Sequence, residues 1–148
     1  SPDLPRQVTD DDGTTRRPSN DPKAAEQEYS RQTSIFPIMH VVAIKAELVA
    51  QYPWLPRTLL DAFTESKRLG MARLNDPRSV CLAWLRALHA EGRALLGPDP
   101  WRYGLDDDNQ NTLETFLRYA ERQGVTARKV GVEELFHPST LADVPHYV

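Results

Sequence analysis

The sequence predicts an α/β fold that is mostly helical, with one or two strands. The strand prediction rests on residues 38–44, where apolar residues follow one another without helical spacing and Ile38, Val41, Val42 and Ile44 are β-branched. The helix prediction rests on several segments in which apolar residues recur at intervals of three and four along one face. We therefore expect about five helices and one clear strand.

Composition narrows the class of protein. The 148 residues are enough for one domain with a core, and 40% of them are hydrophobic. A net charge of −3, with arginines interleaved among acidic residues, argues against a nucleic-acid surface. Cys81 is the only cysteine, so neither a disulfide framework nor a cysteine metal site is expected, and the cytoplasm is the expected location. No membrane span or signal peptide is expected either.

The chain divides by composition into three parts. Residues 1–20 contain three prolines and an acidic run but almost no apolar side chains, which is typical of an extended or disordered connector. Residues 21–141 carry the helical patterns and form the predicted folded part. Residues 142–148 show no pattern and are interpreted as a tail.

The first expected helix begins at a recognisable cap. Asp21 followed by proline matches an N-cap with proline at the first helical position. The helix is expected to continue to about Arg31 and to bury Ala25 and Tyr29.

Two longer amphipathic helices are expected next. The apolar face of the first comprises Leu59, Leu60, Phe63, Met71 and Leu74. The pair Asp76–Pro77 repeats the cap-plus-proline start and opens the second, which Gly97–Pro98 end. The apolar stripe of this second helix comprises Cys81, Trp84, Leu85, Leu88 and Leu95. We interpret Cys81 and Trp84 as core residues rather than functional ones.

The last long helix is expected to start at an acidic run. Asp106, Asp107 and Asp108 supply the negative charge that favours a helix N-terminus, and Gly124 supplies the stop. The expected apolar face comprises Leu113, Phe116, Leu117 and Ala120. A short helical turn from Val132 to Phe136 is expected to end before a proline.

The single predicted strand has no partner strand among the predicted elements. Unpaired buried N–H and C=O groups are costly, so residues 38–44 need a partner strand. The partner could come from the N-terminal arm, from a second copy of the chain or from a missing portion, and we favour the missing portion.

Several blocks of the sequence, taken together and in order, resemble one enzyme family. The blocks are Arg16-Arg17, Glu28-Tyr29, Thr33, Ile35-Phe36-Pro37-Ile38-Met39-His40, Tyr103-Gly104-Leu105, Thr112-Leu113-Glu114, Phe116-Leu117-Arg118-Tyr119, Gln123-Gly124 and Glu133-Glu134-Leu135-Phe136. The family is that of 4,5-dihydroxyphthalate decarboxylase. The resemblance implies a periplasmic-binding-protein type 2-like fold of two α/β lobes, of which this chain would be the C-terminal part. Ser34 stands where the motif is expected to carry glycine.

The resemblance also implies a reaction, the non-oxidative decarboxylation of 4,5-dihydroxyphthalate to protocatechuate and CO2. Such chemistry requires no electron-sink cofactor, and no cofactor or metal is expected. Because an imidazole titrates near neutral pH, His40 is the candidate catalytic residue, as general acid or proton shuttle. The alternative is a buried histidine that is satisfied by a backbone carbonyl.

Four residues are candidates for binding the substrate. Thr33 and Ser34 could donate hydroxyl or backbone N–H bonds to a carboxylate, or could simply form a turn. Arg102 could pair with a carboxylate and Tyr103 could close over the ligand, although packing of this loop is the alternative that we favour.

Two other classes of function remain open. The same fold could serve as a non-catalytic solute-binding module for a small organic acid. The chain could also be an inactive fragment that needs a separate N-terminal lobe or assembles as a homo-oligomer. The expected partner is a small aromatic acid, with neither nucleic acid nor membrane.

Overall fold

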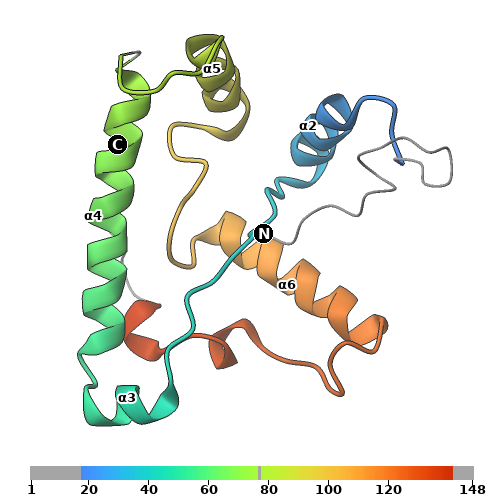
Figure 1. Cartoon of the computed structure of the whole chain (residues 1–148). Helices are drawn as coiled ribbons and strands as arrows, with labels where there is room; N and C mark the ends of the chain where they lie inside the picture. Colours follow the sequence, from blue (N-terminus) through green and yellow to red (C-terminus); the bar gives the residue numbers. More distant parts are fainter. Residues whose placement is uncertain (1–17, 77, 142–148) are drawn as a thin grey trace, which may run out of the picture. The chain divides into compact units, whose positions relative to one another are not determined.

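The computed structural model describes residues 18–76 and 78–141, and all regular structure within these ranges is helical (Figure 1). The chain separates into two compact units, Ser1–Ser34 and Ile35–Val148. The predicted α/β class is wrong for the described residues, because no strand or sheet occurs among them. The predicted tail 142–148 and most of the predicted connector 1–20 lie outside the described residues.

The described part of the first unit is built around helix α2 (Pro22–Thr33), whose predicted start is confirmed. The side chain of Asp21 accepts a hydrogen bond from the backbone N–H of Ala24 at 3.0 Å. The helix continues two residues beyond the expected end. It buries none of its side chains, so the predicted burial of Ala25 and Tyr29 is not found.

Ser34 ends α2 in a left-handed backbone conformation. Its φ is 56° and its ψ is 23°, and its backbone N–H donates to the carbonyl of Ser30 at 2.9 Å. Because a β-carbon is disfavoured in this region, glycine is the usual residue at such a helix end. The conformation therefore gives a physical reason for glycine at this position of the motif.

The substitution Ser34→Gly is expected to stabilise α2 by about 0.5–1 kcal/mol, because it removes the left-handed strain. Slower hydrogen exchange of the α2 amides would show the gain. Ser30→Gly inside the same helix is the matched control and is expected to speed exchange, since glycine costs about 0.8–1 kcal/mol relative to alanine in a helix interior. Faster exchange in both variants would contradict this account of Ser34.

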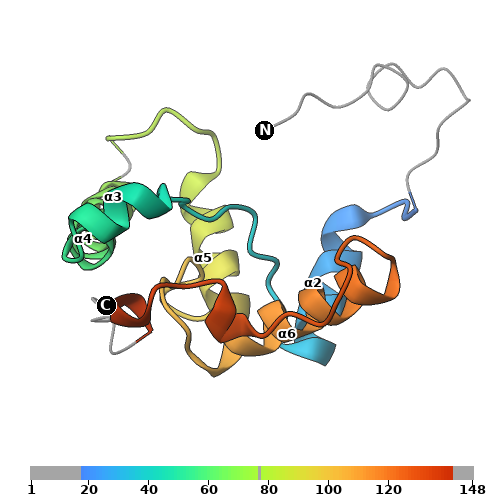
Figure 2. The ribbon, with the colours of Figure 1, turned by 90° about the horizontal axis from the view of Figure 1, so that it is seen from below.

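The segment 35–45 joins α2 to the second unit's helices as an extended chain without a sheet, so the strand predicted at 38–44 is wrong. Figures 1 and 2 contain no strand arrow along it. Ile35 is buried, whereas Met39 is 73% exposed and Val41 is 66% exposed. β-Branched residues favour an extended backbone, but a strand also needs a neighbouring strand, and the described residues supply none.

Three helices follow this segment: α3 (Ala46–Gln51), which the sequence did not predict, α4 (Leu55–Asn75) and α5 (Leu85–Leu96). Helix α4 contacts both α3 and α5. The predicted amphipathic helix at α4 is confirmed, but its apolar face is only partly covered. Thr64 is buried there, whereas Phe63 is 43% exposed.

The helix expected to begin at Asp76–Pro77 begins eight residues later, at Leu85. Asp76 instead accepts hydrogen bonds from the backbone N–H of Arg78 and the hydroxyl of Ser79, which form a turn. Pro77 lies outside the described residues. Cys81 and Trp84 precede the helix, Cys81 is exposed and Trp84 is 82% exposed, so their predicted place in the core is wrong.

Helix α6 (Asp107–Arg122) agrees with the prediction at both ends. Asp106 is its N-cap and accepts from the backbone N–H of Asn109 at 2.8 Å. Past the C-terminus, Gly124 has a φ of 72° and the N–H of Val125 donates to the carbonyl of Ala120 at 2.8 Å, the pattern of a Schellman motif. The buried residues of α6 are Thr112, Leu113, Leu117 and Ala120. Phe116, which was expected among them, is 61% exposed.

Two short 3-10 helices follow, η1 (Val132–Glu134) and η2 (Pro138–Thr140), and η1 confirms the expected turn. Leu113 and Leu117 of α6 form the core cluster with Val132. Glu134 closes η1 by accepting from the backbone N–H of Gly131, and η2 contacts α4. The hydrogen bonds from Arg128 and from this N–H lower the pKa of Glu134 to about 2.

None of the described helices is long and apolar enough to cross a membrane.

Candidate functional site

The loop 97–106 between α5 and α6 carries Arg102 and Tyr103, and a lysine of α4 holds it in place. The ammonium of Lys67 donates to the Asp99 carboxylate at 2.6 Å and to the carbonyl of Trp101 at 3.1 Å. It also lies 4.8 Å from the ring centroid of Tyr103. The Lys67 and Asp99 side chains are only 14% and 13% exposed. This well-covered ion pair therefore links the middle of α4 to three residues of the loop.

Helix α6 holds the same loop from its other end. The side-chain amide of Asn109 donates to the carbonyls of Arg102 and Gly104, at 3.1 and 2.8 Å. Gly104 has a φ of 88°, which a residue with a side chain rarely adopts. The backbone on either side of Tyr103 is thus fixed by the first turn of α6.

The guanidinium of Arg102 lies among carboxylates. It forms ion pairs with Asp106, at 2.8 Å, and with Asp108. Two negative charges already face this cation, so a substrate carboxylate would have to share it with them or displace one of them.

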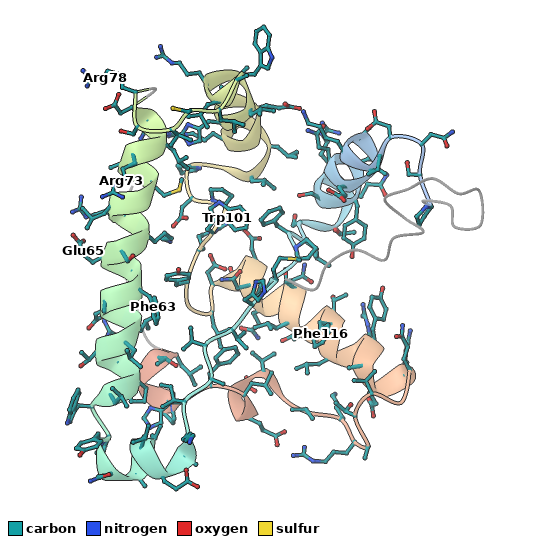
Figure 3. The ribbon with its side chains drawn as sticks, in the orientation of Figure 1. Phe63, Glu65, Arg73, Arg78, Trp101 and Phe116 are labelled. Atoms are coloured by element: carbon teal, nitrogen blue, oxygen red, sulfur yellow. The ribbon has the colours of Figure 1, made fainter. Side chains whose placement is uncertain are left out.

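An aromatic contact joins the loop to the extended segment. The rings of Phe36 and Trp101 meet edge to face, with centroids 5.1 Å apart and an interplanar angle of 68°. The Trp101 side chain is 51% exposed, and Figure 3 shows it on the loop between α5 and α6. The contact brings the predicted strand motif and the predicted substrate-binding loop together at these two rings.

The other candidates lie on either side of Phe36 in the sequence. His40 is exposed, four residues beyond Phe36, and forms no hydrogen bond or ion pair with any residue from 18–76 or 78–141. The alternative of a buried, satisfied histidine therefore does not describe it. Thr33 and Ser34 belong to the first unit, where the Thr33 hydroxyl donates to the carbonyl of Tyr29 at 2.7 Å and Ser34 caps α2.

The contacts that shape this site were not predicted from the sequence. Lys67 and Asp99 are separated by 32 residues, so no local spacing announces their contact. One oxygen of Asp99, Oδ1, is covered and accepts no hydrogen bond from the described part of the chain. For Asn109, the only local signal is its place three residues after a helix cap.

Within residues 18–76 and 78–141, no group of three or more histidine, cysteine, aspartate or glutamate side chains could hold a metal ion.

Comparison with known proteins gives one extensive match. The chain is 35% identical over 123 residues to 4,5-dihydroxyphthalate decarboxylase of Comamonas testosteroni, which covers 82% of this chain and 37% of that protein. This similarity supports membership of the 4,5-dihydroxyphthalate decarboxylase family. It agrees with the resemblance that the sequence blocks indicate.

Two shorter matches involve a different named activity. The chain is 35% identical over 95 residues to galactosylgalactosylxylosylprotein 3-beta-glucuronosyltransferase 2 of Homo sapiens and of Canis lupus familiaris, covering 61% of this chain and 28% of each enzyme. No family model matches the chain. This chain thus spans between 28% and 37% of the length of the curated relatives that it matches.

Proposed function

We propose that this chain forms part of an enzyme that removes CO2 from an aromatic dicarboxylic acid, converting 4,5-dihydroxyphthalate to protocatechuate. The observation that supports the proposal is the 35% identity to a decarboxylase of that name over 82% of this chain. The decarboxylase match covers more of both proteins than the glucuronosyltransferase matches do. A cytoplasmic location stays a prediction from composition.

The chemistry needs few groups. One carboxylated ring carbon takes a proton, which interrupts the aromatic ring. The bond from that carbon to its carboxylate then breaks, CO2 leaves, and the electron pair of the broken bond restores the aromatic ring. The hydroxyl para to that carbon supplies electron density, so the protein must deliver the proton and stabilise the dearomatised intermediate. His40 is proposed as the proton donor, and its exposure leaves the imidazole accessible to a ligand.

Four residues are proposed to bind the substrate. Arg102 and Tyr103 are proposed to contact a carboxylate and the ring, which the half-exposed Trp101 beside them supports. Thr33 and Ser34 are proposed to donate hydrogen bonds to a carboxylate from the end of α2.

A second candidate concerns what this chain can do alone. Apolar side chains that a complete fold would cover are exposed, among them Met39 (73%), Trp84 (82%) and Phe116 (61%). The chain also spans only 37% of the decarboxylase that it matches. Both observations favour a fragment that becomes active only with the rest of the family's length, for example as a separate lobe.

A chimera tests both statements. The matched region of the Comamonas protein is replaced by this chain, and the formation of protocatechuate from 4,5-dihydroxyphthalate is measured by chromatography. Activity in the chimera but not in the isolated chain is the expected result. The parent Comamonas protein is the positive control.

The other outcomes contradict one statement each. A folded chimera that binds 4,5-dihydroxyphthalate without converting it would favour the solute-binding alternative and overturn the decarboxylase proposal. Activity of the isolated chain would overturn the need for a further lobe.

A further inference from the structure

The ammonium of Lys67 contacts two aromatic residues of the loop, the backbone carbonyl of Trp101 and the ring of Tyr103. Of its three N–H donors, two have oxygen acceptors, the Asp99 carboxylate and the carbonyl of Trp101. The ammonium also lies over the face of Tyr103, 4.8 Å from the ring centroid, and donates to no further acceptor among residues 18–76 and 78–141. One donor of a well-covered ammonium is thus available for a stronger acceptor.

The surroundings of this donor suit a flat ring. Trp101 is 51% exposed and Tyr103 is 36% exposed, so both residues present surface to solvent, and the Tyr103 ring lies beside the ammonium. A charge-assisted hydrogen bond to a carboxylate is stronger than the attraction of the ammonium to an aromatic face. An incoming carboxylate can therefore replace Tyr103 at the third N–H.

We propose that Lys67 binds one carboxylate of an aromatic diacid, while Arg102, one residue beyond Trp101, takes the neighbouring carboxylate. This assignment rests on the proposed function, which supplies a ligand with two adjacent carboxylates. It adds to the site a residue of α4 that lies 35 positions before Arg102 and that Asp99 holds next to the loop.

Charge balance sets how such a ligand is held. Asp99 faces Lys67, and Asp106 and Asp108 face Arg102, so this part of the loop has no net positive charge. Direct hydrogen bonds, not long-range attraction, must hold the diacid. We expect modest affinity that changes little with salt.

The experiment compares a diacid with a monoacid. Dissociation constants of 4,5-dihydroxyphthalate and of 3,4-dihydroxybenzoate, which lacks one carboxylate, are measured for the full chain by calorimetry or by shifts of the Trp101 indole N–H resonance. The unchanged chain is expected to bind the diacid about tenfold more tightly. In Lys67→Met this preference is expected to vanish, because the diacid loses one of its two cationic partners. Lys67→Arg is expected to restore part of the preference.

Arg68→Met is the matched control, because Arg68 is the next residue and pairs with Glu65 of the same helix at 2.7 Å. Figure 3 shows Glu65 on the side of α4 away from Trp101. This variant is expected to keep the tenfold preference. Far-UV circular dichroism checks that each variant has the helix content of the unchanged chain.

Three results would overturn the assignment: no diacid binding by the unchanged chain, equal affinity for the two acids, or a preference that survives Lys67→Met. If Lys67→Met loses helix content, Lys67→Arg takes its place in the test. A Lys67→Arg variant that shows no preference for the diacid would also contradict the assignment. Failure of the proposed function is a separate result, since a chimera without turnover leaves these binding constants unchanged.

Discussion

Replacement of His40 by alanine in the chimera is expected to lower the turnover of 4,5-dihydroxyphthalate by about 100- to 10,000-fold, the range that a positioned general acid contributes. The reason is that alanine cannot deliver the proton that the ring carbon takes before CO2 leaves. Because His40 is exposed and bonds to no other described residue, its loss is expected to leave stability almost unchanged. The effect should therefore fall on the turnover number rather than on the amount of folded protein.

Met39→Ala is the control for this experiment, because Met39 is the adjacent residue of the same exposed segment. It is expected to change turnover by less than about threefold, since no proton passes through a thioether. Initial rates of protocatechuate formation at saturating substrate decide the comparison. Unchanged turnover in His40→Ala would remove His40 from the mechanism, and equal losses in both variants would point to a packing role for the segment.

The second large effect is expected from the core. Leu117→Ala should lower the free energy of unfolding by about 2–5 kcal/mol, because it empties part of the cluster formed with Leu113 and Val132. Urea denaturation followed by circular dichroism measures the change. The loop 97–106 should also lose order when α6 is destabilised, since α6 supplies the amide of Asn109 that fixes the loop backbone.

Phe116→Ala is the matched control for the core, one residue away on the same helix. Its side chain is 61% exposed, so its loss is expected to cost less than about 1 kcal/mol. A cost equal to that of Leu117→Ala would show that Phe116 is covered in solution and would contradict the described packing.

Local signals predicted the elements that local contacts stabilise. Asp21 and Asp106 were recognised as helix caps, and both accept the expected backbone N–H bond. Gly124 was recognised as a helix stop and has the left-handed conformation that such a stop requires. Ser34 was noted as a departure from glycine, and its positive φ explains why glycine is preferred there.

Signals that depend on a distant partner failed. The β-branched run at 38–44 favours an extended chain, but whether it becomes a strand depends on a neighbour that the described residues do not supply. Asp76 is a residue type that commonly caps helices, yet its side chain accepts the backbone N–H of Arg78 in a turn. A carboxylate side chain can accept backbone N–H groups in either structure, so sequence alone did not separate them.

The contacts around the loop 97–106 were not predicted from the sequence for the same reason. Side-chain chemistry and short stretches of sequence directed attention to His40, Arg102 and Tyr103. Lys67 was overlooked because its contacts with the loop join residues 32 to 36 positions apart. The Phe36–Trp101 contact, which joins the motif segment to the loop, has no sequence signal at all.

The most direct test of the central claim is the release of labelled CO2 from carboxyl-labelled 4,5-dihydroxyphthalate by the chimera. We expect one CO2 for each protocatechuate formed, and no release by the isolated chain. A correctly folded chimera that releases no CO2, under conditions in which the parent Comamonas protein does, would contradict it.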